Sequence, residues 1–428
     1  MAWWRDIAYG VGAAVSSPAW GYALWKTGKW RTDWRGRLGH APKLPAKGAA
    51  RRLLIHAVSV GETNAIRQLV AMLAEQAPAV ELVIASTTNT GFARASELFG
   101  AAPNVVAVVR YPLDFSCAVG RFLDCVQPDA AVMVELELWP NFAEACERRG
   151  VPLAVINGRL SDRSIGRYRM IRPLVHSSFA RLSRAAVQTQ AYADRFVELG
   201  APADRVAVLD TMKWDTAAVS DHVDGADELA AAMGVDRTKP VVVAGSTGVD
   251  EEPLLVEAVR AAGVADVQLI LVPRKPERFD EVARMFPGII RRSTQQSPAP
   301  APGSPSPSPK LFLLDTMGEL RKAYALADVV VVGRSFVRMG GSDPIEPAGL
   351  GKAVIVGGHM QNFSEVVAAF VQADAMIQCD AASLAAQLKR LLSDREAAAA
   401  LGAKARDVIL SRRGATQRHV DMLLELLQ

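Results

Sequence analysis

Short apolar runs alternate with helix-like stretches along the chain from residue 51 onward. Uninterrupted apolar runs rich in β-branched residues are typical of strands buried on both faces of a parallel sheet. The first series comprises residues 53–58, 82–86, 105–109, 130–134, 153–156, 185–188 and 206–209. The second series comprises residues 241–244, 269–272, 311–314, 329–332, 353–356 and 375–377. Two such series predict an α/β protein with two doubly wound domains and a ligand cleft between them.

A polar stretch between the two series, at 216–239, marks the expected seam between the domains. The pattern predicts an N-terminal segment at 1–42, a first domain at 43–220 and a second domain at 221–405. A last helix, at 406–428, is placed to cross back to the first domain.

Residues 293–309 contain six prolines in seventeen positions and almost no apolar side chains. Such a segment cannot form a core, so we expect a flexible polyproline-like loop inside the second domain. A tolerated surface insertion is favoured over a proline-rich recognition motif.

Composition adds three constraints. The chain has 428 residues, half of them hydrophobic, which is enough for two domains with cores of their own. Its four cysteines lack the paired spacing of a zinc site or a disulfide framework, so reduced cytosolic thiols are expected. Outside residues 1–40 the positive and negative charges balance, which argues against a nucleic-acid partner.

Residues 1–40 hold six of the eight tryptophans and carry all of the formal net charge of +4. Tryptophan favours the membrane–water interface, and basic side chains favour the anionic cytoplasmic surface of a membrane. The uncharged stretch between Asp6 and Lys26 is long enough to span a bilayer but only weakly apolar. We expect an uncleaved membrane anchor helix, either a span or an interfacial helix; the alternative is an ordinary surface helix.

A glycine turn beginning at Gly340 and Gly341 is the most informative motif of the second domain. Two glycines let the backbone approach a ligand closely and leave amides free for an anion. Asp343 and Glu346 follow, with Pro344 at an expected first helical position. A glycine turn before a helix suits a phosphate, and a carboxylate suits ribose hydroxyls. Taken alone, the motif favours a helix-capping turn, and the other features of the chain reverse that preference.

Acidic residues follow two strands of the first domain, where open α/β sheets bind ligands. Glu62 ends the motif HAVSVGE, just before a helix expected to open at Thr63. Its carboxylate can take a proton from a hydroxyl, or it can be a first-turn glutamate favoured by the helix dipole. Glu135 and Glu137 follow the fourth strand and would face the same side if that strand continued. His56 is interpreted as a packed strand histidine.

Other strand ends carry hydroxyls, amides and cations. In the first domain these are the motifs STTNTG, NGRLS and MKWD, whose Lys213 could offset charge on a leaving group. In the second domain they are Ser246 and Thr247, then PRKPER and DTMGEL. Arg274 and Arg278 suit a phosphate. Each cluster alone is a weak signal, but all of them lie at carboxyl ends of strands.

In this order the motifs HAVSVGE, STTNTG, ELELWPN, NGRLS, MKWD, PRKPERF, DTMGEL and GGSDPIEPA closely resemble the Kdo transferases of lipid A assembly. The resemblance runs from about residue 20 to the C-terminus. Kdo transferases are GT-B glycosyltransferases that move 3-deoxy-D-manno-octulosonate (Kdo) from CMP-Kdo to a lipid A precursor. The resemblance implies two Rossmann-like domains, the acceptor on the first, the nucleotide on the second, and a place at the cytoplasmic face of the inner membrane.

Carried over by position, Glu62 matches the general base of the family, and Glu135 and Lys213 match residues that stabilise the transition state. The CMP-binding segments are matched by Pro273, Arg274, Met317, Gly318, Glu319, Asp343, Pro344, Ile345 and Glu346. Further acceptor or donor contacts are expected at Ser59, Gly61, Thr88, Glu137, Arg159, Ser246, Thr247, Arg278 and Gly341. The expected partners are CMP-Kdo, a lipid A precursor and an anionic membrane surface, with no metal or other cofactor.

The chain departs from the family pattern at Ser342 and Asp343, where His and Asn are usual, and at Arg334, where Gly is usual. An added carboxylate near a phosphate should weaken donor binding unless Arg334 or Arg338 offsets it. Two alternatives therefore stay open: a sugar-nucleotide epimerase with the same fold, and a degenerate, non-catalytic transferase that binds lipid or nucleotide.

Overall fold

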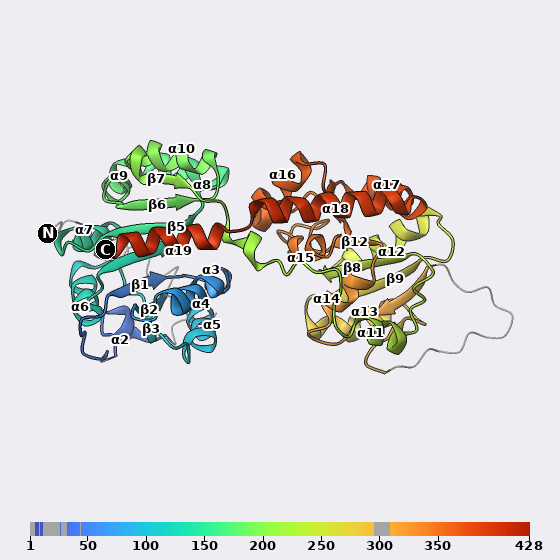
Figure 1. Ribbon diagram of the computed structural model, residues 1–428, viewed down its shortest axis with the longest axis horizontal. Helices are drawn as coiled ribbons and strands as arrows, with labels where there is room; N and C mark the ends of the chain where they lie inside the picture. Colours follow the sequence, from blue (N-terminus) through green and yellow to red (C-terminus); the bar gives the residue numbers. More distant parts are fainter. Residues whose placement is uncertain (1–4, 8, 12–25, 27–31, 43, 295–308) are drawn as a thin grey trace. The chain divides into compact units, whose positions relative to one another are not determined.

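The computed structural model describes residues 5–7, 9–11, 26, 32–42, 44–294 and 309–428. The chain divides into two compact units (Figure 1). Unit 1 comprises the described part of Met1–Thr216 together with Gly414–Gln428, and unit 2 comprises the described part of Ala217–Arg413. The chain therefore passes between the units twice, and the second passage lies at Gly414.

Unit 1 is built on a seven-stranded parallel sheet with the order β3-β2-β1-β4-β5-β6-β7. Its strands are β1 (Arg52–His56), β2 (Glu81–Ser86), β3 (Val105–Arg110), β4 (Ala130–Val134), β5 (Leu153–Gly158), β6 (Arg184–Val187) and β7 (Val206–Val208). Its described helices are α2 (Trp34–Arg37), α3 (Val60–Ala65), α4 (Arg67–Gln76), α5 (Asn89–Phe99), α6 (Ser116–Val126), α7 (Pro140–Arg148), α8 (Asp162–Met170), α9 (Arg172–Ala180), α10 (Gln190–Leu199), η1 (Ala203–Arg205), η2 (Met212–Thr216) and α19 (Ala415–Leu426).

Unit 2 repeats this plan with the strand order β10-β11-β9-β8-β12-β13-β14, again all parallel. Its strands are β8 (Val241–Thr247), β9 (Gln268–Pro273), β10 (Ile290–Arg291), β11 (Lys310–Leu313), β12 (Val329–Val332), β13 (Ala353–Val356) and β14 (Ile377–Gln378). Its described helices are α11 (Ala226–Met233), α12 (Glu251–Ala262), η3 (Pro276–Arg278), α13 (Phe279–Met285), α14 (Leu320–Leu326), α15 (Ile345–Gly349), η4 (Gln361–Phe363), α16 (Ser364–Gln372), α17 (Ala381–Ser393) and α18 (Arg395–Arg412).

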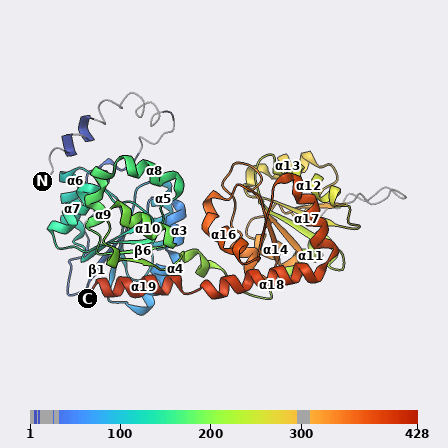
Figure 2. The same ribbon diagram turned by 90° about the horizontal axis from the view of Figure 1, so that it is seen from above.

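The central strands are buried on both faces, as their continuous apolar sequence predicts. In unit 1, Leu53 and Ile55 of β1 pack with α4 and α5 on one face, while Leu54 packs with α6 and α7 on the other. The C-terminal helix α19 lies against α4 and completes the first face with Val420 and Leu423 (Figures 1 and 2). The last helix of the chain is thus part of the core of unit 1.

Each sheet has one point where the direction of strand progression reverses. In unit 1 this switch point lies between β1 and β4, which pair in parallel from Leu53 with Ala130 to His56 with Met133. In unit 2 it lies between β8 and β12. Open α/β sheets bind ligands outside the carboxyl ends of the strands at such a point, because the adjacent loops diverge there.

The strand predictions hold for all thirteen expected runs, with end points shifted by a few residues. The two-residue strand β10 was not expected. The helix expected to open at Thr63 begins at Val60, so Glu62 lies within its first turn. Pro344 is the N-cap of α15 rather than its first residue.

Much of the expected anchor segment and residues 295–308 of the proline-rich loop lie outside the described residues. Within the part of the chain that the structure describes, no helix is both long and apolar enough to cross a bilayer. Arg5 and Tyr9 contact the folded body of unit 1: Arg5 pairs with Glu144 at 2.8 Å, and the Tyr9 hydroxyl donates to Asp114 at 3.1 Å.

Candidate active site

Glu62 lies after β1 at the switch point of unit 1, in the first turn of α3. Its carboxylate accepts hydrogen bonds from the Val58 backbone N–H at 2.8 Å and from the Ser59 hydroxyl at 2.9 Å. Ser59 is the N-cap of α3, so the two residues form a variant of the capping box. Gly61 is exposed, and a side-chain carbon there would meet only the Ser59 hydroxyl, at 3.7 Å, which leaves space for a ligand.

The electrostatics of Glu62 suit a proton acceptor. Burial raises its pKa to about 7, and the negative charges of Glu135 and Glu137 act in the same direction. The hydrogen bonds from Val58 and Ser59 oppose this shift without cancelling it. A carboxyl group that titrates near neutral pH is ionised often enough to accept a proton and basic enough to hold it.

The two other acids come from the neighbouring strand β4. Glu135 follows its last residue and adopts a left-handed backbone conformation, with φ of 62°. The strand therefore ends before Glu135, and the alternation expected for Glu135 and Glu137 does not apply. Both charges nevertheless act on Glu62, so the three carboxyl groups share one neighbourhood. Burial also raises the pKa of Glu137, whose carboxylate accepts a hydrogen bond from the Trp139 indole at 2.8 Å.

The loop after β2 supports the Glu62 loop. The Thr88 hydroxyl donates to the Val58 carbonyl at 2.8 Å and caps α5 by accepting from the Gly91 N–H at 3.0 Å. His56 is fully buried and stacked on Tyr111, with ring centroids 3.7 Å apart. Burial lowers the pKa of His56 to about 3, so it is neutral, as expected of a packed strand histidine.

Lys213 and Arg159 lie beyond β7 and β5 of the same sheet, and Arg159 donates its backbone N–H to the Glu135 carbonyl at 3.4 Å. The buried Asn157 fixes this region. The Asn157 side-chain oxygen accepts a hydrogen bond from the Met212 backbone N–H at 3.4 Å. The Asn157 backbone N–H donates to the His419 Nε2 of α19 at 3.1 Å. Asn157 and His419 were not among the sequence-predicted site residues, because only the tertiary structure brings α19 to β5.

In unit 2, one fully buried carboxylate organises the loops at the switch point. Glu251 accepts hydrogen bonds from the backbone N–H groups of Gly248, Arg334 and Phe336. It therefore joins the loop after β8 to the loop after β12. The sequence contains Glu251 beside Glu252 at the start of a helix, a pattern that indicates only a first turn favoured by the helix dipole.

The glycine turn packs onto this frame. Gly340 and Gly341 have φ of 83° and 81°, which glycine adopts at low cost, and both approach the 360–362 segment closely. Ser342 is buried, with its hydroxyl donating to the Ser246 carbonyl at 3.2 Å. Asp343 accepts from the Ile345 N–H at 2.9 Å, which turns the chain into α15.

Tyr324 lies where the predicted nucleotide-binding segments of unit 2 meet. Burial raises its pKa far above the usual range, and the charges of Glu346 and Asp343 act in the same direction, whereas Ser246 and Arg274 lower it. Five groups from four separate segments of the chain therefore share one neighbourhood. Arg274 is exposed directly after β9, and its guanidinium has no ion-pair partner among the described residues.

Three predicted residues of unit 2 are engaged within the protein. Arg278 is buried and binds Glu252 through both terminal nitrogens, at 2.6 and 3.0 Å. The Thr247 hydroxyl donates to the same carboxylate at 2.6 Å. Burial opposes ionisation of Glu319, but the Thr316 hydroxyl and Arg292 prevail and lower its pKa. Of the cations in the PRKPER motif, Arg274 and Lys275 are exposed, and Lys275 lies 3.7 Å from the Glu277 carboxylate.

Met317 and Gly318 form the exposed tip of the loop after β11. Met317 is 70% exposed, and Gly318 has φ of 84°. Among the described residues, no cluster of three or more His, Cys, Asp or Glu side chains has an arrangement that could hold a metal ion.

Fold and site together define a two-domain α/β protein with a basic carboxylate at one switch point and phosphate-compatible loops at the other. The family model described as 3-deoxy-D-manno-octulosonic-acid transferase (kdotransferase) matches residues 32–216. The 3-deoxy-D-manno-octulosonic acid transferase of Haemophilus influenzae is 32% identical over 401 residues, which cover 92% of this chain and 90% of the relative. The enzyme of that name from Bordetella pertussis is 32% identical over 408 residues, covering 94% of this chain and 93% of the relative.

The chain therefore belongs to the Kdo transferase family of glycosyltransferases. Among solved structures, the UDP-GlcNAc 2-epimerase from Neisseria meningitidis bound to UDP-GlcNAc covers 87% of this chain and all of its own, with a TM-score of 0.57. At 12% identity, this likeness concerns the fold alone. Membership of a transferase family favours transfer over the epimerase and non-catalytic alternatives.

Proposed function

We propose that the chain catalyses inverting transfer of Kdo from CMP-Kdo to a lipid A precursor, with Glu62 as the general base. The observation that carries this proposal is the Glu62 carboxylate at the switch point of unit 1, with a pKa raised to about 7. Family membership supplies the reaction class, and the motif resemblance supplies the donor and the acceptor.

In the proposed reaction, Glu62 removes the proton of an acceptor hydroxyl while that oxygen attacks the anomeric carbon of Kdo. The new glycosidic bond forms on the face opposite the phosphate, and the bond from the anomeric carbon to the CMP oxygen breaks. The proton stays on Glu62, and CMP leaves as a phosphate monoester. Attack from the opposite face inverts the anomeric carbon.

Cations suit the phosphate that accumulates charge in this step. Arg274 is exposed beside the neighbourhood that Tyr324 shares with Asp343 and Glu346, which supports a role with the nucleotide. Lys213, in η2 of unit 1, is proposed to offset charge on the leaving group. Protein cations and backbone amides would carry this role without a metal ion.

We also propose the GT-B arrangement, in which the acceptor binds unit 1, the nucleotide binds unit 2 and the two units face a common cleft. The tryptophan-rich, basic residues 1–40 support attachment to the cytoplasmic face of the inner membrane.

The test is a transfer assay with the full chain, CMP-Kdo and a lipid A precursor in detergent. We expect CMP release that depends on the acceptor, and a product heavier than the acceptor by one or more Kdo units in mass spectrometry. An epimerase would alter the donor sugar without the acceptor. A binding protein would release no CMP, whether or not the acceptor is present. Either result would refute the proposal.

A further inference from the structure

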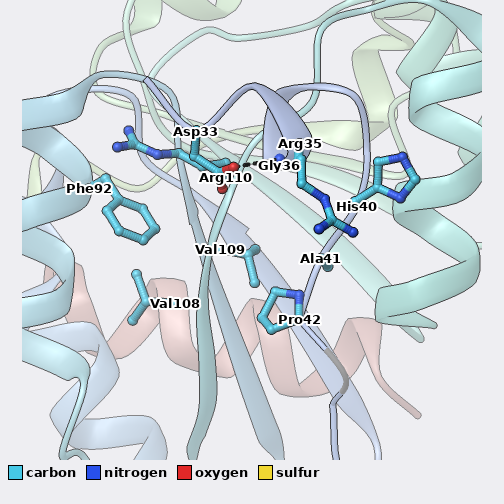
Figure 3. A pocket seen from close by; sticks show the side chains of 10 residues that line it. All are labelled: Asp33, Arg35, Gly36, His40, Ala41, Pro42, Phe92, Val108, Val109 and Arg110. Carbon is cyan, nitrogen blue, oxygen red and sulfur yellow. Dashed lines mark hydrogen bonds between the residues drawn. The ribbon is translucent and has the colours of Figure 1, made fainter. Parts of the chain in front are cut away.

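Unit 1 contains a pocket of ≈ 370 Å³ that lies apart from the Glu62 loop. Its walls are α2 and the residues that follow it, the end of the edge strand β3, and Phe92 of α5 (Figure 3). We call it the α2 pocket; it is lined by Asp33, Arg35, Gly36, His40, Ala41, Pro42, Phe92, Val108, Val109 and Arg110.

The sequence builds this pocket by bringing α2 very close to β3. Asp33 caps α2 by accepting the Gly36 N–H at 3.0 Å. A side-chain carbon at Gly36 would come within 2.8 Å of the Arg110 Cβ and 2.4 Å of the Asp33 carboxylate. Only glycine therefore allows α2 to lie against Arg110 in this way.

The pocket has an excess of positive charge. Figure 3 shows Arg35 extending toward His40 on one side, and Arg110 above the Phe92 ring on the other. The guanidinium carbon of Arg110 lies 4.1 Å from the ring centroid. The lining residues thus include two guanidinium groups, those of Arg35 and Arg110, and one carboxylate, that of Asp33.

A third arginine, Arg37, adds positive charge close to Arg110. Burial lowers the pKa of Arg37, and the positive charge of Arg110 acts in the same direction. The Nε atoms of Arg37 and Arg110 are both buried and have no hydrogen-bond partner among the described residues, so the terminal nitrogens are the donors that a ligand could reach. An anion with several acceptor oxygens would satisfy guanidinium donors.

The remaining wall is apolar. Phe92, Val108 and Val109 face the pocket together with Ala41 and Pro42 (Figure 3). A small, fully hydrated anion would gain nothing from this wall. A phosphate attached to an amphiphile would satisfy the guanidinium donors and bury apolar surface at the same time.

Hydrogen bonds connect the α2 pocket to the Glu62 loop. Arg110 donates to the Thr88 carbonyl at 3.0 Å, the Thr88 hydroxyl donates to the Val58 carbonyl at 2.8 Å, and the Val58 N–H donates to Glu62 at 2.8 Å. In the sheet order β3-β2-β1, the pocket lies two strands from β1. Two strand spacings amount to about 10 Å, which one lipid headgroup can span.

We propose that the α2 pocket binds a phosphate group of the acceptor lipid, with Arg35 and Arg110 as its ligands and the Phe92 wall against the adjoining apolar part. The proposal rests on the proposed function, because it takes the lipid to be the molecule whose hydroxyl meets Glu62. It adds a subsite that fixes the position of the acceptor on unit 1 relative to Glu62.

The test compares a phosphorylated acceptor with the same acceptor after enzymatic dephosphorylation. The test variant is Arg35→Ala, because Arg35 is exposed and its loss leaves the fold intact. We expect Arg35→Ala to raise KM for the phosphorylated acceptor about tenfold, since hydrogen bonds to charged groups contribute at least this much. KM for the dephosphorylated acceptor, KM for the donor and kcat should stay unchanged. Arg35→Ala combined with Arg110→Gln should remove the preference for the phosphate entirely.

Arg184→Ala is the matched control, because Arg184 is an exposed arginine of unit 1 on β6, bonded only to the Ser183 carbonyl. Equal effects of Arg35→Ala on both acceptors, or none, would overturn the pocket proposal and leave the proposed function standing. A wild-type chain that transfers Kdo to neither acceptor would overturn both. If Arg35→Ala weakens sedimentation with phosphatidylglycerol vesicles when no acceptor is present, the pocket binds bulk membrane lipid and the proposal is wrong.

Discussion

Glu62 combines two roles that the sequence presented as alternatives. It lies in the first turn of α3 and takes part in the cap with Ser59, as a structural glutamate would. Yet burial and two neighbouring carboxylates hold its pKa at about 7 instead of leaving it low, as a cap alone would. The protein thus keeps a costly negative charge at the switch point, and such a cost is expected where a base is needed.

Replacing Glu62 by Gln should abolish most of the activity, because the amide keeps the size of the side chain but cannot accept the proton. We expect kcat to fall by about 10² to 10⁴. In the wild type, the deprotonated form is the active one, so kcat/KM should rise with pH and level off above an apparent pKa near 7. Steady-state rates measured from about pH 5 to about pH 9 test this profile. A residual activity above about a tenth would show that another group is the base.

Glu62→Gln should lower the activity of the protein but raise its stability. The Glu62 pKa is raised in the folded protein, from a usual value of 4.5 to about 7, so folding disfavours the charged form. Below pH 4.5 both folded and unfolded states hold the proton and nothing is lost; above pH 7 the full penalty applies. Glu62→Gln should therefore gain stability relative to wild type as pH rises through this window. Urea unfolding at the two ends measures this, and an identical difference at both ends would contradict the raised pKa.

Sequence reasoning located site residues where a strand end was followed by a charged or hydroxyl side chain. In this way it selected Glu62, Glu135 and Arg274, each of which lies beyond the end of a strand. It did not select Tyr324, and it placed Asn157 only within the motif NGRLS, because a tyrosine in a helix and an asparagine at a strand end are common in any fold. Their importance depends on which loops meet around them, and that depends on the strand order.

At the scale of elements, the strands were predictable because burial on both faces leaves long apolar runs. β10 was missed because it is two residues long and lies at the sheet edge next to polar sequence. The loops were less predictable, because their paths depend on contacts between distant segments. Five of the nine left-handed non-glycine residues in the described chain lie at carboxyl ends of strands: Glu135, Asn157, Asp210, Ser246 and Arg334. Such strained positions cluster at functional sites.

Glu251 clamps the loop after β8 to the loop after β12 through its hydrogen bonds, and this clamp offers a test at the scale of elements. Its two oxygens accept three backbone N–H groups from two loops, and Gln would replace one oxygen by a donor. We expect Glu251→Gln to destabilise unit 2 by about 1 to 3 kcal/mol and to weaken CMP binding. Calorimetry measures both quantities. Glu257→Gln, at an exposed position of the same helix, is the control and should change neither. If Glu251→Gln destabilises unit 2 but leaves the CMP affinity unaltered, the clamp stabilises the unit without contributing to nucleotide binding.

At the scale of the whole molecule, the expected last helix at 406–428 is divided between two helices. α18 ends at Arg412 within unit 2, and α19 begins at Ala415 within unit 1. Asp215 fixes this passage, because its carboxylate accepts the N–H groups of Gly414 and Thr416 at 2.7 and 2.6 Å. The sequence pattern could not show this division, since both segments are helical and only Arg413 and Gly414 separate them.

Removing residues 414–428 should unfold unit 1 and spare unit 2. The deletion takes Val420 and Leu423 from the core, and each fully buried side chain of this kind contributes about 1.5 to 3 kcal/mol. With the buried Met422 and Leu427 and the His419 bond, the loss approaches the total stability of a domain, about 5 to 15 kcal/mol. Limited proteolysis should leave a fragment within 217–413 and digest 44–216. Survival of both units would show that α19 is dispensable.

The position of α19 also has a consequence for biosynthesis. Translation proceeds from the N-terminus, so unit 2 is synthesised in full while unit 1 still lacks one of its helices. Until the codons of α19 are read, the nascent sheet exposes the apolar face that Val420 and Leu423 later cover. The half-finished domain is then the species that chaperones must shield, and a circular permutant that places α19 ahead of β1 should need less of their help.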